Sequence, residues 1–477
     1  MRVVRGLWAA GRRGLTWVAA VLTGWLLVAG CAAGSVPGAA GKAGTAGAAS
    51  AQLWAERYNG FGNGFDRAAS VVVSPDGRRV YVTGRSAGRS LKGDYATIAY
   101  DAVTGARLWV SRYNGSANGY DFATTVALSP DGKTVFVTGT IYGGPASPRD
   151  DATIAYDAVT GARLWVSIYP GQDPYGYGFG PMGMVVSPDG RTVYVMGHEM
   201  SGVGSDGVKT YGFGIIAYDA ATGARLWDSI FAPPGGSAIP EGIGISPDGT
   251  NVFVTGMNDS AGRDTVAFDA ATGARLWASS GYAGFGLTTS LAVRPGGGTV
   301  FVSGSRGGRL RLDTIAYDAA TGTRRWESAG PPGGAWSLAV SPDGTKVFAT
   351  GYAREAVSTY LTVAYDAATG TRLWVSRYSA PARKDNTAMA AAVSPDGRTV
   401  FVTGVSTGAT SQEDCATVAY AADTGAQLWV RRYNGPANGA DACTAIAVSR
   451  TGHTVFVTGS STGVTSGSDY VTIAYRA

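Results

Sequence analysis

A tryptophan that recurs once per repeated unit is the feature that most constrains the fold of this chain. It usually stands within Arg-Leu-Trp, and successive copies are 48 to 62 residues apart. After each copy come an apolar run, a turn related to Ser-Pro-Asp-Gly, a Val-Phe-Val-Thr-Gly-like run and a Thr-Ile-Ala-Tyr-like run. A period of this length indicates a repeat architecture built from one supersecondary unit. The eight copies are Trp54, Trp109, Trp165, Trp227, Trp277, Trp326, Trp374 and Trp429.

Two kinds of turn separate the runs within each unit. From Ser74 to Gly77, proline sets the backbone of the first central position and glycine takes the left-handed position that follows. From Asp101 to Gly105, the aspartate carboxylate can accept hydrogen bonds from backbone amides two or three residues on. Each unit is therefore predicted to be a meander of four short antiparallel strands.

Both faces of these predicted sheets are apolar. In residues 80–82 and 98–100 neither set of alternating side chains is polar, so each sheet must be covered on two sides. Stacking twisted sheets around an axis meets this demand, and four strands in about 40 to 50 residues are typical of a β-propeller. The sequence predicts an all-β fold, an eight-bladed β-propeller of four-stranded antiparallel blades, over residues 51–477.

The two ends of the repeat region predict how the ring closes. Residues 52–58 form a lone strand of the fourth type, and residues 471–475 form a strand of the third type with no fourth after it. Pairing of these two strands completes the eighth blade and removes the edges that would otherwise be exposed there.

The first thirty residues are typical of an export signal. Four arginines come before an apolar run over residues 15–30, and small residues at 28–30 lead to Cys31. This ending resembles the bacterial lipobox, which implies cleavage before Cys31 and a lipid on its thiol. The alternative is an uncleaved membrane anchor, for which the run is short. Residues 31–50, rich in Gly, Ala and Ser, are then a lipidated cysteine and a flexible tether.

Charge and composition narrow the function. Four of the 39 Lys and Arg residues lie in the predicted signal, which leaves 35 against 34 acidic residues. Such a balance does not favour nucleic acid as a partner. Two histidines are too few for a His-rich centre, so any catalysis would depend on carboxylates. We assign no catalytic residue and no cofactor, and we expect a monomer.

The repeat resembles known propeller families. The pattern Asp-Ala-x-Thr-Gly-x-x-x-Trp, as from Asp101 to Trp109, is similar to the tryptophan-docking repeat of pyrroloquinoline quinone (PQQ) type propellers. The Ser-Pro-Asp-Gly half is similar to YVTN-type repeats. The resemblance covers nearly all of residues 52–477 and implies the fold, but propellers host enzymes and scaffolds alike. The adjacent cysteines and the Cys-x-x-Cys-His segment typical of quinoprotein alcohol dehydrogenases do not occur in the sequence.

Two cysteines occupy related positions in adjacent units. Cys415 takes the place that Tyr95 has at the start of a third strand, and Cys443 takes the place of Ala123 at the start of a first strand. Both are expected near the same rim of the ring. In an exported protein this predicts a disulfide, and the alternative is two separate buried thiols.

A pattern Asn-x3-Asn-x2-Asp recurs in three of the predicted loops between blades. Oxygen-rich loops of this kind could hold calcium, and the candidate ligands are Asp66, Asp121 and Asp441. Further acids are expected on the same rim at Asp94, Asp414 and Asp469. We favour a structural interpretation, in which the Asn-Gly pairs supply left-handed turns and the aspartates cap backbone amides.

The third unit departs most from the repeat. Two of its loops, residues 170–183 and 198–214, are long and aromatic. Exposed rings on a rigid scaffold commonly hold a glycan, a peptide or a protein, and the alternative is that the rings pack the long loops together. His198 is isolated and is expected to be structural. The candidate ligand-contacting residues on this rim are Tyr175, Tyr177, Phe179, Tyr211 and Phe213.

Two functions remain open from the sequence. The favoured one is a membrane-anchored extracytoplasmic lipoprotein, held at the cell membrane by Cys31, that binds or scaffolds a protein or a polymer such as a polysaccharide through its rim. The other is a propeller enzyme, a hydrolase, lactonase or PQQ-type oxidoreductase, with a carboxylate or metal centre near the axis. The first needs only the loops described, whereas the second predicts converging acids or a metal in the central channel.

Overall fold

The computed structural model describes residues 52–89, 92–142, 144, 149–171, 181–203, 209–233, 236–258, 262–282, 289–306, 310–380, 384–408 and 411–477. Within these ranges the regular structure is β-strand, apart from one short 3-10 turn, η1 (Phe61–Asn63). No helix in the same ranges is long and apolar enough to cross a membrane. The predicted signal, Cys31 and the tether lie outside the described residues.

The strands follow one another as successive meanders, numbered here as blades 1 to 8. Blade 1 contains β2 (Arg67–Val73), β3 (Arg79–Ala87), β4 (Gly93–Asp101) and β5 (Arg107–Tyr113), and blade 2 contains β6 (Phe122–Leu128), β7 (Thr134–Ile141), β8 (Asp150–Asp157) and β9 (Arg163–Tyr169). Blade 3 contains β10 (Gly183–Val186), β11 (Thr192–Val203), β12 (Lys209–Asp219) and β13 (Arg225–Phe231). Blade 4 contains β14 (Ala238–Ile245), β15 (Asn251–Asn258), β16 (Gly262–Asp269) and β17 (Arg275–Tyr282).

Blades 5 to 8 complete the ring. Blade 5 contains β18 (Thr289–Val293), β19 (Thr299–Arg306), β20 (Arg311–Asp318) and the first half of β21 (Arg324–Val340), and blade 6 contains the second half of β21 with β22 (Lys346–Ala353), β23 (Thr359–Asp366) and β24 (Arg372–Tyr378). Blade 7 contains β25 (Asn386–Val393), β26 (Thr399–Thr407), β27 (Glu413–Ala421) and β28 (Gln427–Tyr433). Blade 8 contains β29 (Asp441–Val448), β30 (Thr454–Thr462) and β31 (Ser468–Arg476) together with β1 (Gln52–Tyr58).

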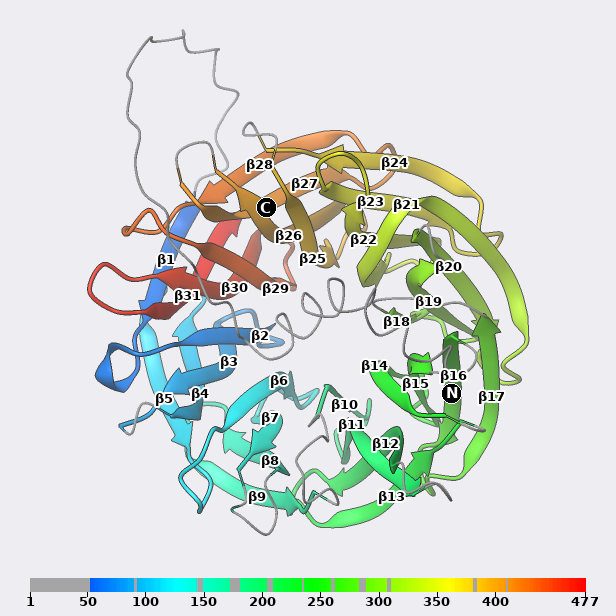
Figure 1. The fold of residues 1–477 in the computed structure, drawn as a ribbon, viewed down its shortest axis with the longest axis horizontal. Coiled ribbons are helices and arrows are strands. Elements are labelled where there is room, and N and C mark those ends of the chain that lie inside the picture. Colours follow the sequence, from blue (N-terminus) through cyan, green and yellow to red (C-terminus); the bar gives the residue numbers. More distant parts are fainter. Residues whose placement is uncertain are drawn as a thin grey trace, which may run out of the picture. The chain divides into compact units, whose positions relative to one another are not determined.

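Hydrogen-bonded pairing divides the described strands into six sheets of four strands and one sheet of seven. In the larger sheet, β21 pairs with β20 through its first half and with β22 from Gly333 onward, so it serves two blades. The result is eight four-stranded antiparallel meanders arranged in a ring (Figure 1). This is the predicted all-β, eight-bladed propeller.

The ring closes between the two ends of the repeat region. β1 pairs antiparallel with β31, from Gln52 opposite Tyr475 to Tyr58 opposite Tyr470. Blade 8 therefore takes its outer strand from the start of the propeller and its other three strands from the end (Figure 1). The predicted closure is confirmed.

The apolar core lies between the blades. The buried apolar residues of the described chain fall into eight clusters, each formed by two neighbouring blades. Each sheet is thus covered on both faces, as its two apolar faces require. The innermost strands also lie against one another around the ring, with β2 next to β6 on one side and to β29 on the other.

The repeated tryptophans link each blade to the next. Trp54 in blade 8 donates its indole N–H to the carbonyl of Ala102 in blade 1 at 3.1 Å. Gly105 lies against the Trp54 ring with φ of +76°, and a Cβ at that glycine would come within 2.8 Å of the ring. The tryptophan is therefore a core residue, as predicted. The equivalent indole bond is made by Trp109, Trp165, Trp227, Trp277, Trp326 and Trp374.

One position near the start of each third strand faces the following blade, and we call it the junction position. Tyr95 holds it in blade 1 and donates its hydroxyl to the carbonyl of Ala152 in blade 2 at 3.3 Å. Phe213 holds it in blade 3 and is fully buried with Phe231 in the core. The ring of Phe213 is thus unavailable on the rim, which corrects its prediction as a ligand-contacting residue. In chain order the junction residues are Tyr95, Asp151, Phe213, Arg263, Leu312, Tyr360, Cys415 and Tyr470.

Candidate binding surface

Three loops between blades share one backbone frame. In the loop of residues 59–66, the Asn59 amide donates to the side-chain oxygen of Asn63 at 2.8 Å, and Asn63 is left-handed with φ of 52°. The loops of residues 114–121 and 434–441 repeat this bond and this backbone geometry. The predicted left-handed Asn turns are therefore present in all three loops.

The aspartate that ends each loop binds backbone amides. Asp66 accepts from Gly60 N–H at 2.9 Å and from Ala87 N–H at 2.8 Å. Asp121 and Asp441 accept from the equivalent amides of Gly115 and Gly435, each at 2.6 Å. Burial raises the pKa of all three carboxyl groups. This geometry agrees with the favoured structural interpretation, and the described residues contain no group of three or more His, Cys, Asp or Glu arranged to hold a metal.

An arginine–aspartate–serine cluster lies under two of these loops, residues 59–66 and 434–441. Arg112 contacts Asp94 at 3.0 Å and donates to the Ser86 hydroxyl at 2.7 Å. A Cβ on Gly60 would collide with this serine, so the loop of residues 59–66 rests directly on the cluster. The acids predicted on this rim are thus neutralised by guanidinium groups. The cluster under the loop of residues 434–441 is Arg57, Asp469 and Ser461. A third cluster, Arg432, Asp414 and Ser406, lies in blade 7, where the Ser406 hydroxyl donates to Asn386. The loop of residues 114–121 lies over Ile141 instead of a serine.

The three loops have the same frame but carry different side chains. Phe61 and Phe65 project from the first loop with 46% and 39% of their surface exposed, and Tyr120 projects from the second with 59% exposed. The third loop has Pro436 and Ala440 at the positions of Phe61 and Phe65. Large exposed rings are therefore concentrated on the two loops that flank blade 1.

Arginines connect these rings into one surface. The guanidinium of Arg85 lies 5.5 Å from the centre of the Phe65 ring and 5.3 Å from that of Tyr120. Arg89 lies 5.2 Å from the centre of the Phe61 ring. Cation–π contact holds both kinds of side chain in place. We call these five residues the aromatic–arginine patch.

The sequence predicted aromatic contacts on blade 3 instead. Tyr211 there is half-buried and stacks on His198 with ring centres 4.7 Å apart. Burial lowers the pKa of His198 to about 4, which fits its expected structural role. Tyr175, Tyr177 and Phe179 lie outside the described residues. The signal that was missed is the pair of aromatic residues, Phe65 and Tyr120, that precede the loop aspartates.

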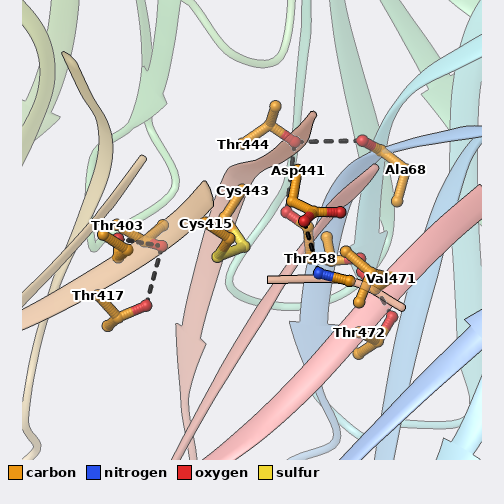
Figure 2. Close-up of a disulfide and its surroundings, with 12 residues drawn as sticks. Ala68, Thr403, Cys415, Thr417, Asp441, Cys443, Thr444, Thr458, Val471 and Thr472 are labelled. Atoms are coloured by element: carbon orange, nitrogen blue, oxygen red, sulfur yellow. Dashed lines mark hydrogen bonds between the residues drawn. A yellow bond between two sulfur atoms is a disulfide. The ribbon is translucent and has the colours of Figure 1, made fainter. Parts of the chain in front are cut away.

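The structure joins Cys415 of β27 and Cys443 of β29 by a disulfide, with Cα atoms 5.0 Å apart (Figure 2). Both residues are fully buried. Cys415 holds the junction position of blade 7, so the disulfide links blade 7 to blade 8. At the equivalent place between blades 1 and 2, Tyr95 and Ala123 pack in the same apolar cluster.

The fold and the patch define a β-propeller with a group of exposed aromatic rings and arginines on its rim. The family model described as outer membrane protein assembly factor BamB matches residues 42–239, 212–331 and 311–468, and the chain belongs to this family. No curated protein matches the sequence.

Several solved structures share the fold. Sqt1 of Chaetomium thermophilum, bound to the N-terminus of ribosomal protein L10, is 13% identical with a TM-score of 0.58, over 88% of this chain and 98% of that one. The Dos1 propeller is 12% identical with a TM-score of 0.55, over 88% and 95%. Quinohemoprotein alcohol dehydrogenase ADHIIG of Pseudomonas putida HK5 is 15% identical with a TM-score of 0.53, over 89% and 76%. At these identities the likeness concerns the fold alone.

Proposed function

We propose that this chain is a membrane-anchored extracytoplasmic lipoprotein that binds a protein partner through the aromatic–arginine patch and acts as a scaffold. The observation that carries this proposal is the set of three exposed rings interleaved with two arginines on one rim. Aromatic residues and arginine are the side chains that most often dominate protein–protein binding energy. The family description as an assembly factor supports a protein rather than a polysaccharide as partner.

The frame beneath the patch favours binding with little loss of entropy. The loop of residues 59–66 is fixed by its own Asn–Asn bond, by Asp66 and by the Arg112 cluster. Rings held in place before binding cost less ordering when a partner arrives. Arg89 is exposed beside the rings and can pair with a carboxylate. A partner segment with apolar and acidic side chains fits this surface.

The enzyme alternative needs acids that converge near the axis. The acidic pair without a basic neighbour in the described chain, Asp151 and Glu199, lies on β8 and β11 rather than on the innermost strands β6 and β10. The likeness to the quinohemoprotein concerns the fold alone. We therefore do not extend the proposal to catalysis.

The patch is tested by photo-crosslinking in intact cells. A photoreactive phenylalanine analogue at Phe65 should crosslink to one defined protein, whereas the same analogue at Ala440, which has the same loop frame without the neighbouring rings, should not. With the partner purified, Phe61→Ala combined with Phe65→Ala should weaken binding at least tenfold. The control is Pro436→Ala, at the position equivalent to Phe61. Equal crosslinking from both sites, or unchanged affinity, would contradict the proposal.

The anchor is tested separately. Cys31→Ser should abolish incorporation of labelled fatty acid and release the protein from the membrane fraction, because the thiol is the proposed site of the lipid. Membrane association of the unmodified chain without any incorporation of labelled fatty acid would indicate an uncleaved anchor instead. The patch variants serve as controls, since they leave Cys31 intact.

A further inference from the structure

The junction between blades 2 and 3 differs from the other junctions in its side chains. Asp151 holds the junction position where blade 1 has Tyr95, so a carboxylate replaces an aromatic ring. The residue opposite it in blade 3 is Gly214, at the place where blade 2 has Ala152. Both replacements reduce the side-chain volume at these two positions relative to the junction between blades 1 and 2.

A second acid enters the same place from blade 3. Glu199 stands where blade 1 has Ser86, and only 6% of its surface is exposed. The guanidinium that binds Ser86 has no counterpart, because Ile230 stands where blade 1 has Arg112. Glu199 is thus buried at a position from which the neutralising arginine has been lost.

Both carboxylates lie next to Gly197. A Cβ placed on Gly197 would lie 3.5 Å from Oδ2 of Asp151 and 3.7 Å from Oε1 of Glu199. The side chain of Glu199 runs over Gly214, where the methyl group of an alanine would collide with its Cγ. Glycine at both positions thus allows the acids to approach.

Nothing in the described part of the chain neutralises this pair. Within that part neither carboxylate has a hydrogen-bonding or ionic partner, whereas the nearby acids do. Asp150 accepts from Gly171 N–H at 3.0 Å, and Asp228 lies 3.3 Å from Arg225. Burial, with the nearby Asp228, raises the pKa of Glu199 to about 7, and burial, Glu199 and Asp150 raise that of Asp151 well above its usual range.

We propose that Asp151 and Glu199 bind a hard divalent cation, Ca²⁺ or Mg²⁺, between blades 2 and 3. Both ions prefer oxygen ligands, and sites with one or two carboxylates complete their coordination with water. A cation in this place balances two negative charges that otherwise repel each other in a poorly solvated environment. The aspartates that end the three rim loops differ, because each accepts a hydrogen bond from a backbone amide.

The proposal is tested with the purified full-length chain after chelation. Calcium or magnesium chloride, each added alone at pH 7.5, should raise the unfolding midpoint by a few degrees at about 100 times the dissociation constant. Calorimetric titration should give one site. Glu199→Gln and Asp151→Asn should each weaken binding at least tenfold, because each removes one of the two carboxylates.

The matched control is Asp189→Asn, which removes an exposed acid from the turn before β11 of the same blade and should bind like the unmodified chain. The unfolding midpoint of Glu199→Gln in chelator shows that this variant folds. A midpoint that no cation raises but that acid alone raises would indicate a proton shared by the pair and would overturn the proposal. Equal cation binding by Glu199→Gln and the unmodified chain would overturn it as well.

Discussion

The rim of blade 1 and the junction between blades 2 and 3 use the same backbone positions for opposite electrostatics. In blade 1, Ser86, Asp94 and Arg112 form a closed cluster in which each charge has a partner. In blade 3 the equivalent positions hold Glu199, Gly212 and Ile230, so a charge has been added and its partner removed. Equivalent positions of the repeat thus hold a neutralised cluster in one blade and a buried acid without its arginine in another.

The largest loss of stability should come from removing the arginine of the cluster formed by Ser86, Asp94 and Arg112. Arg112→Met leaves the carboxylate of Asp94 buried without a counterion, and the free energy of unfolding should fall by about 3 to 5 kcal/mol in urea titrations. The control is Arg324→Met, whose exposed pair with Glu327 should contribute less than about 1 kcal/mol. Equal losses in the two variants would show that the cluster of blade 1 is not a structural requirement.

Removing the disulfide tests how much a covalent contact between two blades stabilises the protein. Cys415→Ala with Cys443→Ala should lower the free energy of unfolding by about 3 kcal/mol, because the bond closes a loop of 28 residues and restricts the unfolded chain. A reductant should lower the stability of the unmodified chain by a similar amount and leave the double variant unchanged. If reductant has no effect on the unmodified chain, the two thiols are not bonded in solution.

The charge of Glu199, at the junction between blades 2 and 3, should make the stability of the protein depend on pH in the presence of chelator. Its pKa is raised from 4.5 to about 7 by folding, so the folded state holds the proton more tightly. The contribution to stability is complete below pH 4.5 and is lost as the pH rises through 7. Ionised Glu199 should then cost on the order of 3 kcal/mol. Glu199→Gln should exceed the unmodified chain by this order at pH 8 and match it near pH 4.5.

That comparison relies on the difference between two chains at each pH, because other acids titrate in both. Asp76 and Asp101, for example, have pKa values lowered by hydrogen bonds in their turns. A difference that does not change between pH 4.5 and 8 would contradict the assignment of Glu199 as the titrating group.

The smallest loss of stability should come from removing the hydroxyl of a tyrosine at the junction position. Tyr95→Phe removes the donor to the Ala152 carbonyl and keeps the ring, so thermal unfolding should report a loss of about 1 kcal/mol. Tyr360→Phe and Tyr470→Phe remove the equivalent bonds and should behave alike. A loss near zero in all three variants would assign the junction to ring packing alone.

The fold could be predicted because its determinants are local and repeated. The turn that begins at Ser74 and the one that begins at Asp101 make the hydrogen bonds that their residue types suggest. The continuity of β21 could not be predicted, since Pro331, Pro332 and the glycines around them are typical of a turn, whereas the strand passes from one sheet into the next.

The candidate sites were harder to predict because they depend on contacts between units. Arg85 meets Phe65 and Tyr120 only because two loops lie side by side on the rim. Asp151 and Glu199 approach only through the register of blade 2 against blade 3. The burial of Phe213, by contrast, was available from the alignment of the repeats, in which it takes the place of Tyr95.

The closure of blade 8 also determines when the protein can finish folding. Arg57 and Asp469, which meet across this blade, are 412 positions apart in the chain. A polypeptide made from its N-terminus therefore holds residues 52–58 without their sheet until the last strand has left the ribosome. Contacts of such long range form slowly, so closure of blade 8 is expected to be a late step of folding.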